Sequence, residues 1–323
     1  MNHIKHISLM NTLGKKRTPF LFIIDFDMKN SLCLPLEYVS PEEILFYING
    51  FKNYSFSKKS NIEIILEKEP VDYEYYLRAF DRVQKYFKEG YSYLLNLTFP
   101  TKISINLSLK DVFINSNAKY KLYFKNKFVT FSPETFVKIR DKKIFSYPMK
   151  GTIRGNIPEA ERAILNNEKE RAEHVTIVDL IRNDIGQVAN NVRVERFCYT
   201  EKIETNEGEL IQTSSEITGE LSEDYNEHIG DILFTLLPAG SVTGAPKKKT
   251  VEIIKEVEEY DRGYYTGIFG YFDGKNLDSG VMIRFIENKD GTYYYKSGGG
   301  IMVYSDPLDE YKELLDKVYV PIV

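Results

Sequence analysis

Two short strands joined by a tight turn constrain this chain more than any other feature of its sequence. Residues 134–140 and 143–150 alternate in polarity, and Asp141-Lys142 between them suits a turn. The apolar face of this predicted hairpin carries Thr135, Val137, Ile139, Phe145, Tyr147 and Met149, and the polar face carries Glu134, Lys138, Arg140, Ser146 and Lys150. If the turn centres on Lys142, Glu134 pairs with Lys150, which predicts a carboxyl group beside an amine.

Lys150 ends an apolar strand, residues 144–149, and is followed directly by Gly151-Thr152. An ammonium group has little reason to occupy such a position, so Lys150 is a candidate nucleophile with Glu134 beside it. The alternative is a cross-strand ion pair on a solvated face, because charged residues often lie opposite one another in sheets. The hairpin alone leaves both interpretations open.

The composition describes a globular protein and excludes several classes. Of 323 residues, 42% are hydrophobic and 28% charged, which is ample for a core in one large or two ordinary domains. A net charge of -4, with lysines scattered among acids, argues against a nucleic-acid partner. The apolar stretch at residues 20–24 is too short for a signal peptide or a membrane span, so we expect a cytoplasmic protein.

Cysteines and histidines predict neither a disulfide framework nor a zinc site. Cys33 and Cys198 are too few for either, and the four histidines lack metal-ligand spacing: His3, His6, His174 and His228.

The chain shows no repeat or linker, so its organisation is inferred from content. Residues 1–70 are expected to form a short N-terminal scaffold with a few strands and a helix starting near Pro41, and residues 71–323 hold every cluster of chemical groups. Residues 73–89 predict an amphipathic helix whose apolar stripe belongs to the core: Tyr76, Phe80, Val83 and Phe87. Further strands are expected at 91–98, 121–131, 267–272, 281–287 and 292–296, and further helices at 158–182 and from about 305.

Three later features point to anion binding. The loop from Gly240 to Lys247 precedes a helix and offers unpaired N–H groups to an anion, although it lacks the Gly-Lys-Ser/Thr ending of a Walker A loop. Gly298-Gly299-Gly300 suits close backbone approach to a carboxylate, or alternatively a tight turn or bulge. Arg284, inside the apolar strand predicted at 281–286, requires a carboxylate partner from substrate or protein.

Two acidic pairs lie at i,i+3 spacing on predicted helices, Glu170 with Glu173 and Glu310 with Glu313. Carboxylates gathered from two helices suit magnesium, which keeps water and substrate oxygens in its other positions. The alternative is a pair of solvated helix faces, because Glu256 and Glu259 have the same spacing.

Together these segments resemble the chorismate-utilising enzymes, the family of anthranilate synthase component I, isochorismate and salicylate synthases and aminodeoxychorismate synthase component I. The resemblance runs from about Gly90 to Lys317 and rests on long motifs in order: Ser132-Pro133-Glu134-Thr135-Phe136, Pro148-Met149-Lys150-Gly151-Thr152, residues 170–186, residues 240–247, residues 262–267, and residues 298–301 followed by 309–313. It implies an α+β fold of the anthranilate synthase component I type, with largely antiparallel sheets in a sandwich and helices packed outside.

Within this family the resemblance of the Lys150 motif is to the aminodeoxychorismate synthase form, Pro-x-Lys-Gly-Thr, whereas anthranilate synthases carry alanine at that position. It implies a transferase that makes 4-amino-4-deoxychorismate for the p-aminobenzoate and folate route. Lys150 would attack C2 of chorismate while Glu134 protonates the departing C4 hydroxyl, and ammonia would then add at C4 and expel the lysine. Anthranilate synthase component I or isochorismate synthase is the alternative, and a non-catalytic chorismate-binding subunit is a third possibility.

The resemblance also implies ligands. Glu173 and Glu313 would bind Mg²⁺, with Glu170 and Glu310 supporting them. Substrate carboxylates would be held by the following residues: Thr152, Thr243, Tyr265, Arg284, Gly298, Gly299, Gly300 and Lys317. Because the chain carries no glutaminase signature, ammonia would come from a separate glutamine amidotransferase subunit.

The chain departs from the family pattern at three places. Gln212 stands where many members have histidine, and Leu94 replaces a frequent glutamine. The Leu-Leu-Glu-Ser segment by which relatives bind tryptophan is also missing, so we expect no tryptophan feedback.

Overall fold

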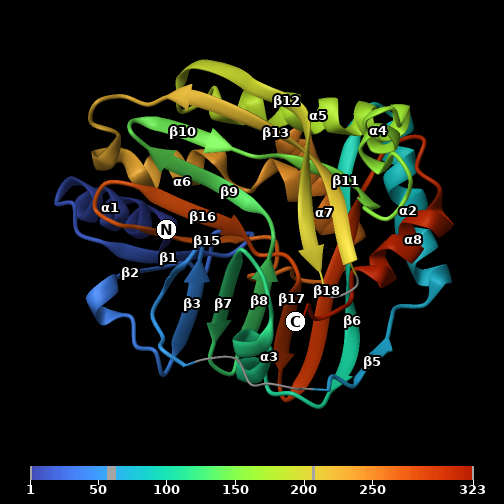
Figure 1. Cartoon of the computed structure of the whole chain (residues 1–323), viewed down its shortest axis with the longest axis horizontal. Helices are drawn as coiled ribbons and strands as arrows, with labels where there is room; N and C mark the ends of the chain where they lie inside the picture. The colour runs from blue at the N-terminus through green and yellow to red at the C-terminus, as the bar shows by residue number, and fades with distance from the viewer. Residues whose placement is uncertain (1, 57–62, 206–207, 322–323) are drawn as a thin grey trace.

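The computed structural model describes residues 2–56, 63–205 and 208–321 and contains two antiparallel sheets within them (Figure 1). The first sheet runs in the order β11-β13-β10-β9-β16-β15-β1-β2, with β12 beside β13. Its strands are β1 (Phe20–Ile24), β2 (Leu32–Pro35), β9 (Thr135–Arg140), β10 (Lys143–Ser146), β11 (Met149–Arg154), β12 (Asn190–Thr205), β13 (Gly208–Glu220), β15 (Ile268–Phe272) and β16 (Leu277–Val281).

The second sheet runs in the order β14-β6-β18-β17-β8-β7-β3-β4, with β5 beside β6. Its strands are β3 (Ile44–Ile48), β4 (Phe51–Lys52), β5 (Leu66–Glu69), β6 (Leu94–Ile105), β7 (Tyr120–Phe124), β8 (Phe128–Ser132), β14 (Gly244–Ala245), β17 (Phe285–Lys289) and β18 (Thr292–Ile301). The helices are α1 (Asn2–Lys15), α2 (Tyr73–Lys88), α3 (Leu109–Asn115), α4 (Ala160–Leu165), α5 (Glu168–Ile185), α6 (Ile229–Leu236), α7 (Lys247–Val257) and α8 (Pro307–Asp316).

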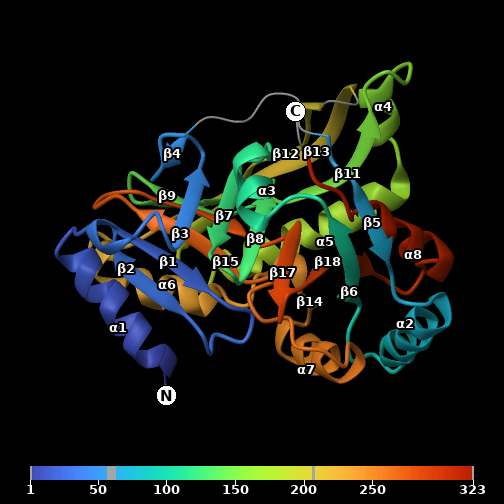
Figure 2. The same ribbon diagram turned by 90° about the horizontal axis from the view of Figure 1, so that it is seen from below.

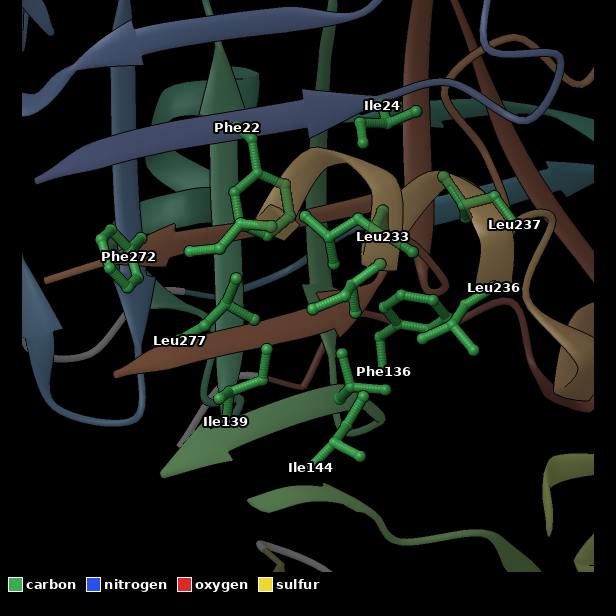
Figure 3. Packing of buried hydrophobic residues seen from close by; sticks show 14 of the residues in the cluster. Phe22, Ile24, Phe136, Ile139, Ile144, Leu233, Leu236, Leu237, Phe272 and Leu277 are labelled. Atoms are coloured by element: carbon green, nitrogen blue, oxygen red, sulfur yellow. The ribbon is translucent and has the colours of Figure 1, made fainter. Parts of the chain in front are cut away.

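Strand β1 explains how the two sheets come to be stacked. All five of its residues are buried, because both of its faces are covered. Phe20, Phe22 and Ile24 pack with residues of α1 and α6, whereas Leu21 and Ile23 pack against strands of the second sheet. Figure 3 shows the first of these clusters, in which Phe22 and Phe136 lie beside Leu233 and Leu236 of α6. The expected sandwich with outer helices is confirmed.

A second helical layer covers the β6–β18 part of the second sheet. The expected apolar stripe of α2, represented by Tyr76 and Phe80, is buried and packs with Leu97 and Phe99 of β6. Asp72 caps this helix by accepting a hydrogen bond from the Glu74 N–H. Figure 2 shows α1 with α6 on one side of the molecule, and α2, α7 and α8 gathered on the other. Helix α8, which carries Glu310 and Glu313, lies against β18.

The predicted register of the hairpin at residues 134–150 is wrong. Asp141 and Lys142 both adopt left-handed φ angles, 50° and 60°, so the turn centres between them and Ile144 pairs with Ile139. The buried face therefore includes Ile144, and Phe145 lies on the other face. Strand β10 also ends before Tyr147-Pro148, because proline cannot donate to the ladder, and the chain continues as β11 along β13. Glu134 and Lys150 are not cross-strand partners.

Other local predictions also need correction. Helix α1 was not expected, and the helix expected near Pro41 is a turn leading into β3. Residues 281–287 are the ends of two strands in different sheets, with Arg284 between them at a φ of 53°. The N-terminal strands contribute to both sheets, β1 and β2 to the first and β3 and β4 to the second. Among the described residues, no helix is long and apolar enough to span a membrane.

Candidate active site

A cavity of about 140 Å³ lies where the two sheets meet α5 and α8. A single water needs only roughly 10–15 Å³ of such space, so this cavity has room for a small organic molecule. It is lined by Leu94, Asn96, Glu134, Met149, Lys150, Glu173, Ile177, Ser241, Val242, Gly244, Tyr265, Ile283, Arg284, Lys296, Ser297, Gly298, Gly300 and Lys317. The structure thus brings together both predicted catalytic residues and several predicted substrate-binding residues from segments far apart in the chain.

Glu134 lies between β8 and β9, with its carboxyl group at the cavity wall. Its backbone N–H donates to Ser132 Oγ at 3.1 Å, and its carbonyl accepts from the Val281 N–H, which together fix the orientation of the residue. Ser241 Oγ donates a hydrogen bond to Glu134 Oε1. Burial raises the pKa of Glu134 against the opposing effects of Ser241, Arg284 and Lys317. A carboxyl group that keeps its proton more readily than usual suits a general acid.

Lys150 points from β11 toward α5, where its Nζ lies 2.6 Å from Glu173 Oε2. Strand β11 has a bulge here, and Gly151 takes a φ of 76°, which changes the direction of the strand at this point. The Lys150 side chain is 26% exposed and that of Glu173 only 6%. Burial lowers the pKa of Lys150, but Glu173, with smaller contributions from Glu313 and Glu170, outweighs burial and leaves that pKa raised. The ammonium form therefore persists as long as this pairing does.

A second lysine of the cavity wall, Lys317, directly follows the last residue of α8. Lys317 Nζ lies 2.5 Å from Glu313 Oε1 and donates to the Gly298 carbonyl at 2.8 Å. Burial lowers the pKa of Lys317, with Glu313 opposing that effect. The two glutamates expected to bind Mg²⁺ are thus each paired with a lysine of the cavity wall.

The acidic residues offer hard oxygen donors of the kind that Mg²⁺ prefers. Glu310 is 7% exposed, and burial together with the neighbouring Glu313 and Glu173 raises its pKa, which marks a cluster of like charges that a divalent cation would neutralise. As they stand, no three His, Cys, Asp or Glu side chains in the described part of the chain are gathered closely enough to hold a metal. The residue types fit the ion, provided that Glu173 and Glu313 exchange their lysine partners for it.

The three glycines belong to β18 rather than to a turn, and they pair with Thr98, Leu97 and Asn96 of β6. A Cβ at Gly298 would lie 2.3 Å from the Leu97 carbonyl oxygen, so strand packing alone requires glycine there. A Cβ at Gly299 would lie 3.4 Å from Glu310 Oε2 and 3.5 Å from Glu313 Oε1. The strand backbone therefore lies close to the α8 carboxylates. An ion or a ligand carboxylate bound beside them would also lie close to this backbone.

Arg284 is a half-buried cation in the cavity wall. Its Nε donates to the Tyr319 hydroxyl at 3.4 Å, and its guanidinium group lies over the Tyr319 ring. No carboxylate among the described residues forms an ion pair with it. A guanidinium group with one long hydrogen bond retains donors for a carboxylate of a ligand. Tyr265 is buried beside it, and burial raises the pKa of this tyrosine, which keeps its hydroxyl protonated.

Several predicted residues do not line the cavity. Thr243 is fully buried, and its hydroxyl donates to the Ala239 carbonyl at 2.6 Å, so this side chain shapes its own loop. Thr152 belongs to β11 opposite Gln212, and its side chain lies outside the described part of the structure. Leu94, in place of the frequent glutamine, does line the cavity and makes that wall apolar.

The sequence motifs do not identify four polar residues of the wall, Asn96, Ser241, Lys296 and Ser297. For Ser241, within the loop at residues 240–247, the available signal is its hydroxyl group. Lys296 ends the strand predicted at residues 292–296. Its Nζ lies 2.9 Å from Glu287 Oε2 and donates to the Arg262 carbonyl, and burial lowers its pKa. Its Nζ also donates to the Asp261 carbonyl at 3.3 Å, so all three donors of this ammonium group are used within the protein. Lys296 therefore adds positive charge to the wall but offers no free donor to a ligand.

Comparisons with known proteins identify the family of the chain. The family model described as chorismate binding enzyme matches residues 35–322. The chain is 52% identical over 316 residues to a Haemophilus influenzae protein named "Uncharacterized PabA-like protein", covering 98% of this chain and 96% of that protein. It is 34% identical over 260 residues to aminodeoxychorismate synthase component 1 of Bacillus subtilis, covering 75% of this chain and 53% of that protein.

A solved structure shares the fold. Anthranilate synthase component I of Streptococcus pneumoniae superposes with a TM-score of 0.67 at 25% identity, covering 88% of this chain and 62% of that one. The expected anthranilate synthase component I fold is thereby confirmed.

Proposed function

The chain belongs to the chorismate-binding enzyme family, and we propose that within this family it is the synthase component of aminodeoxychorismate synthase, forming 4-amino-4-deoxychorismate from chorismate and ammonia. One observation carries the proposal: Lys150 lines the same cavity as the half-buried acid Glu134, whose pKa is raised. An amine at this position can act as a covalent nucleophile while the hydroxyl group of the substrate is replaced by an amino group. The likeness to the Bacillus subtilis protein of that name supports the assignment.

In the proposed reaction the uncharged Lys150 amine forms a bond to C2 of chorismate. Both ring double bonds shift, and the C4 hydroxyl leaves as water with the proton of Glu134. Ammonia next adds at C4, both double bonds shift back, and the C2–nitrogen bond breaks to release Lys150. The proton that ammonia loses returns to Glu134, so the acid is regenerated and the atoms balance.

Binding of the substrate would use the cations of the cavity wall. We assign one carboxylate to Arg284 with Tyr265, because that guanidinium group retains donors, and Lys317 lies near the same part of the wall. The other carboxylate would lie toward Gly299 and the acidic helices. Glu173 and Glu313 would hold Mg²⁺ there, with Glu170 and Glu310 beside them, and the ion would supply a positive centre for that carboxylate.

The ammonia would come from a separate glutamine amidotransferase. The name component 1, carried by the Bacillus subtilis relative, supports a division of the activity between two chains. In this chain Cys33 is buried and burial raises the pKa of its thiol to about 12, which does not suit a nucleophile for glutamine.

Product analysis tests this proposal. The purified chain is incubated with chorismate, Mg²⁺ and ammonium, and the products are separated by chromatography. Aminodeoxychorismate supports the proposal, whereas anthranilate with pyruvate, or isochorismate, would assign the chain to a sister activity of the family. Unchanged chorismate would point to a non-catalytic binding subunit.

A further inference from the structure

A buried ion pair joins the end of α5 to the loop that carries Ser241. Lys247 Nζ lies 2.8 Å from Asp184 Oδ2, and the two side chains are only 19% and 9% exposed. The same Nζ donates to the Leu236 carbonyl at 2.9 Å, at the end of α6. Neither Asp184 nor Lys247 lines the main cavity, so neither touches a molecule bound there. Any effect of this pair on the main cavity is therefore transmitted through the residues that it holds.

Asp184 also sets the position of the loop by direct packing. A Cβ at Gly240 would lie 2.8 Å from Asp184 Oδ2, so the loop backbone rests against this carboxylate. The loop is also held at Val242, whose carbonyl accepts a hydrogen bond of 2.8 Å from the Arg262 guanidinium group. Ser241 lies between these two anchored residues, and its hydroxyl is directed at Glu134 Oε1.

A small second cavity of about 20 Å³ also borders Glu134. Its wall includes Glu134, Ser241, Gly240 and Asp184, together with apolar residues of α5 and α6. Glu134 and Ser241 thus line both cavities. A small displacement of the loop would change the volume beside the acid and the direction from which Ser241 reaches it.

We propose that Asp184 is a positioning residue for the general acid: through Lys247 and Gly240 it holds Ser241 against Glu134 Oε1, which leaves Oε2 to deliver the proton into the main cavity. This inference rests on the proposed function for the role of Glu134 as an acid. The hydrogen-bond arrangement itself is independent of which family member's reaction the chain catalyses.

The test compares Asp184→Asn, Lys247→Met and Ser241→Ala with a control on the same helix. Asp179→Asn is that control, because it breaks an Asp179–Arg182 pair of 2.7 Å that is exposed to solvent. In assays with chorismate, we expect each of the three variants to lower kcat about tenfold or more with little change in KM, because a misplaced acid affects the transition state rather than carboxylate binding. The control keeps the wild-type kcat.

A double-mutant cycle separates positioning from general damage. If Asp184 acts through Ser241, the Asp184→Asn/Ser241→Ala double variant is no slower than the slower single variant. Multiplied effects, a rise in KM alone, or a wild-type kcat in Asp184→Asn would each overturn the proposal. Urea unfolding of every variant verifies that the fold is retained, and Lys247→Arg, which keeps the charge, should restore activity relative to Lys247→Met.

An infrared measurement keeps the test independent of turnover. Spectra are recorded at acidic pH, where Glu134 holds its proton, and its carbonyl stretch is identified by its loss in Glu134→Gln. We expect the same shift of this band in Ser241→Ala and Asp184→Asn, since Arg284 and Lys317, the charged groups that act on Glu134, are unchanged in both. An unshifted band in Asp184→Asn would overturn the proposal even if the chain makes a different product from chorismate.

Discussion

Lys150 Nζ lies 2.6 Å from Glu173 Oε2, so the proposed nucleophile is bound to a proposed magnesium ligand. The same carboxylate cannot fully serve an ammonium group and a metal ion. In the proposed reaction Lys150 must be uncharged, whereas its pairing with Glu173 favours the charged form. Binding of Mg²⁺ at Glu173 would therefore remove the partner that holds Lys150 in its unreactive state.

Removing the competing ammonium group should strengthen metal binding. We expect Lys150→Met to bind Mn²⁺, a spectroscopic substitute for Mg²⁺, about tenfold more tightly, which corresponds to about 1.4 kcal/mol. Electron paramagnetic resonance of free Mn²⁺ measures the dissociation constant. Lys102→Met serves as a control, because it removes a lysine from the exposed Lys102–Glu69 pair. Equal or weaker Mn²⁺ binding by Lys150→Met would show that lysine and metal do not compete.

The same variant should be less stable without metal. Loss of Lys150 leaves the buried Glu173 carboxylate without its ion-pair partner, and we expect the free energy of unfolding to fall by about 1–3 kcal/mol. Saturating Mg²⁺ should restore part of this loss, because binding to the folded state alone stabilises it. Urea unfolding with EDTA and with Mg²⁺ provides the comparison, and a metal-independent loss would argue against a site at Glu173.

Replacing the proposed ligands with neutral amides should weaken metal binding. Glu173→Gln and Glu313→Gln should each raise the Mn²⁺ dissociation constant by tenfold or more, because an amide oxygen is a poorer ligand for a hard cation than a carboxylate. Glu259→Gln is a matched control from the exposed pair Glu256 and Glu259, which has the same spacing. If all three variants bind Mn²⁺ like the wild type, Glu173 and Glu313 are not metal ligands.

The raised pKa of Glu134 makes stability depend on pH. The folded chain holds this proton more tightly than the unfolded chain, whose carboxyl has a reference pKa of 4.5. The contribution of Glu134 to the free energy of unfolding therefore falls as pH rises from 4.5 through the raised pKa. Glu134→Gln lacks this titration, so it should gain stability relative to the wild type over that window while losing activity. Urea unfolding across a pH series would show a constant difference if the account of Glu134 is wrong.

The nitrogen source provides a separate prediction. Ammonium alone should support turnover, and glutamine alone should not until an amidotransferase is added. Activity at fixed total ammonium should rise with pH in the neutral range, because more of it is uncharged NH₃. Glutamine-dependent product from the purified chain, verified free of other glutaminases, would contradict the proposed division of labour.

The sequence motifs predicted which residues line the cavity, but not the strand register of the hairpin that precedes Lys150. Lys150, Glu134, Arg284 and Lys317 line one cavity as expected, because their motifs mark the ends of strands and helices that converge there. The hairpin register failed by one position, since left-handed angles at both Asp141 and Lys142 move the turn centre between them. Alternation of polarity did not distinguish these registers, because Ser146 is buried and Phe145 is only half-buried.

Local sequence patterns could not predict the ion pairs between side chains of distant elements. Nothing in the periodicity of α5 indicates that Glu173 pairs with Lys150, or that Asp184, three turns further on, pairs with Lys247. The apolar neighbours of Arg284 in the sequence predict that it lies within a strand. The structure shows instead that the chain leaves one sheet at Val281 and enters the other at Phe285.

Mass spectrometry of the Lys150 peptide tests the central claim most directly. The wild type is incubated with chorismate and Mg²⁺ without ammonium, quenched with acid and digested. The account predicts a peptide containing Lys150 that is heavier by the mass of chorismate less one water, absent from Lys150→Ala and lost when ammonium is added before the quench. An unmodified Lys150 in enzyme that still makes aminodeoxychorismate at full rate, or the adduct on Lys296 or Lys317 instead, would contradict it.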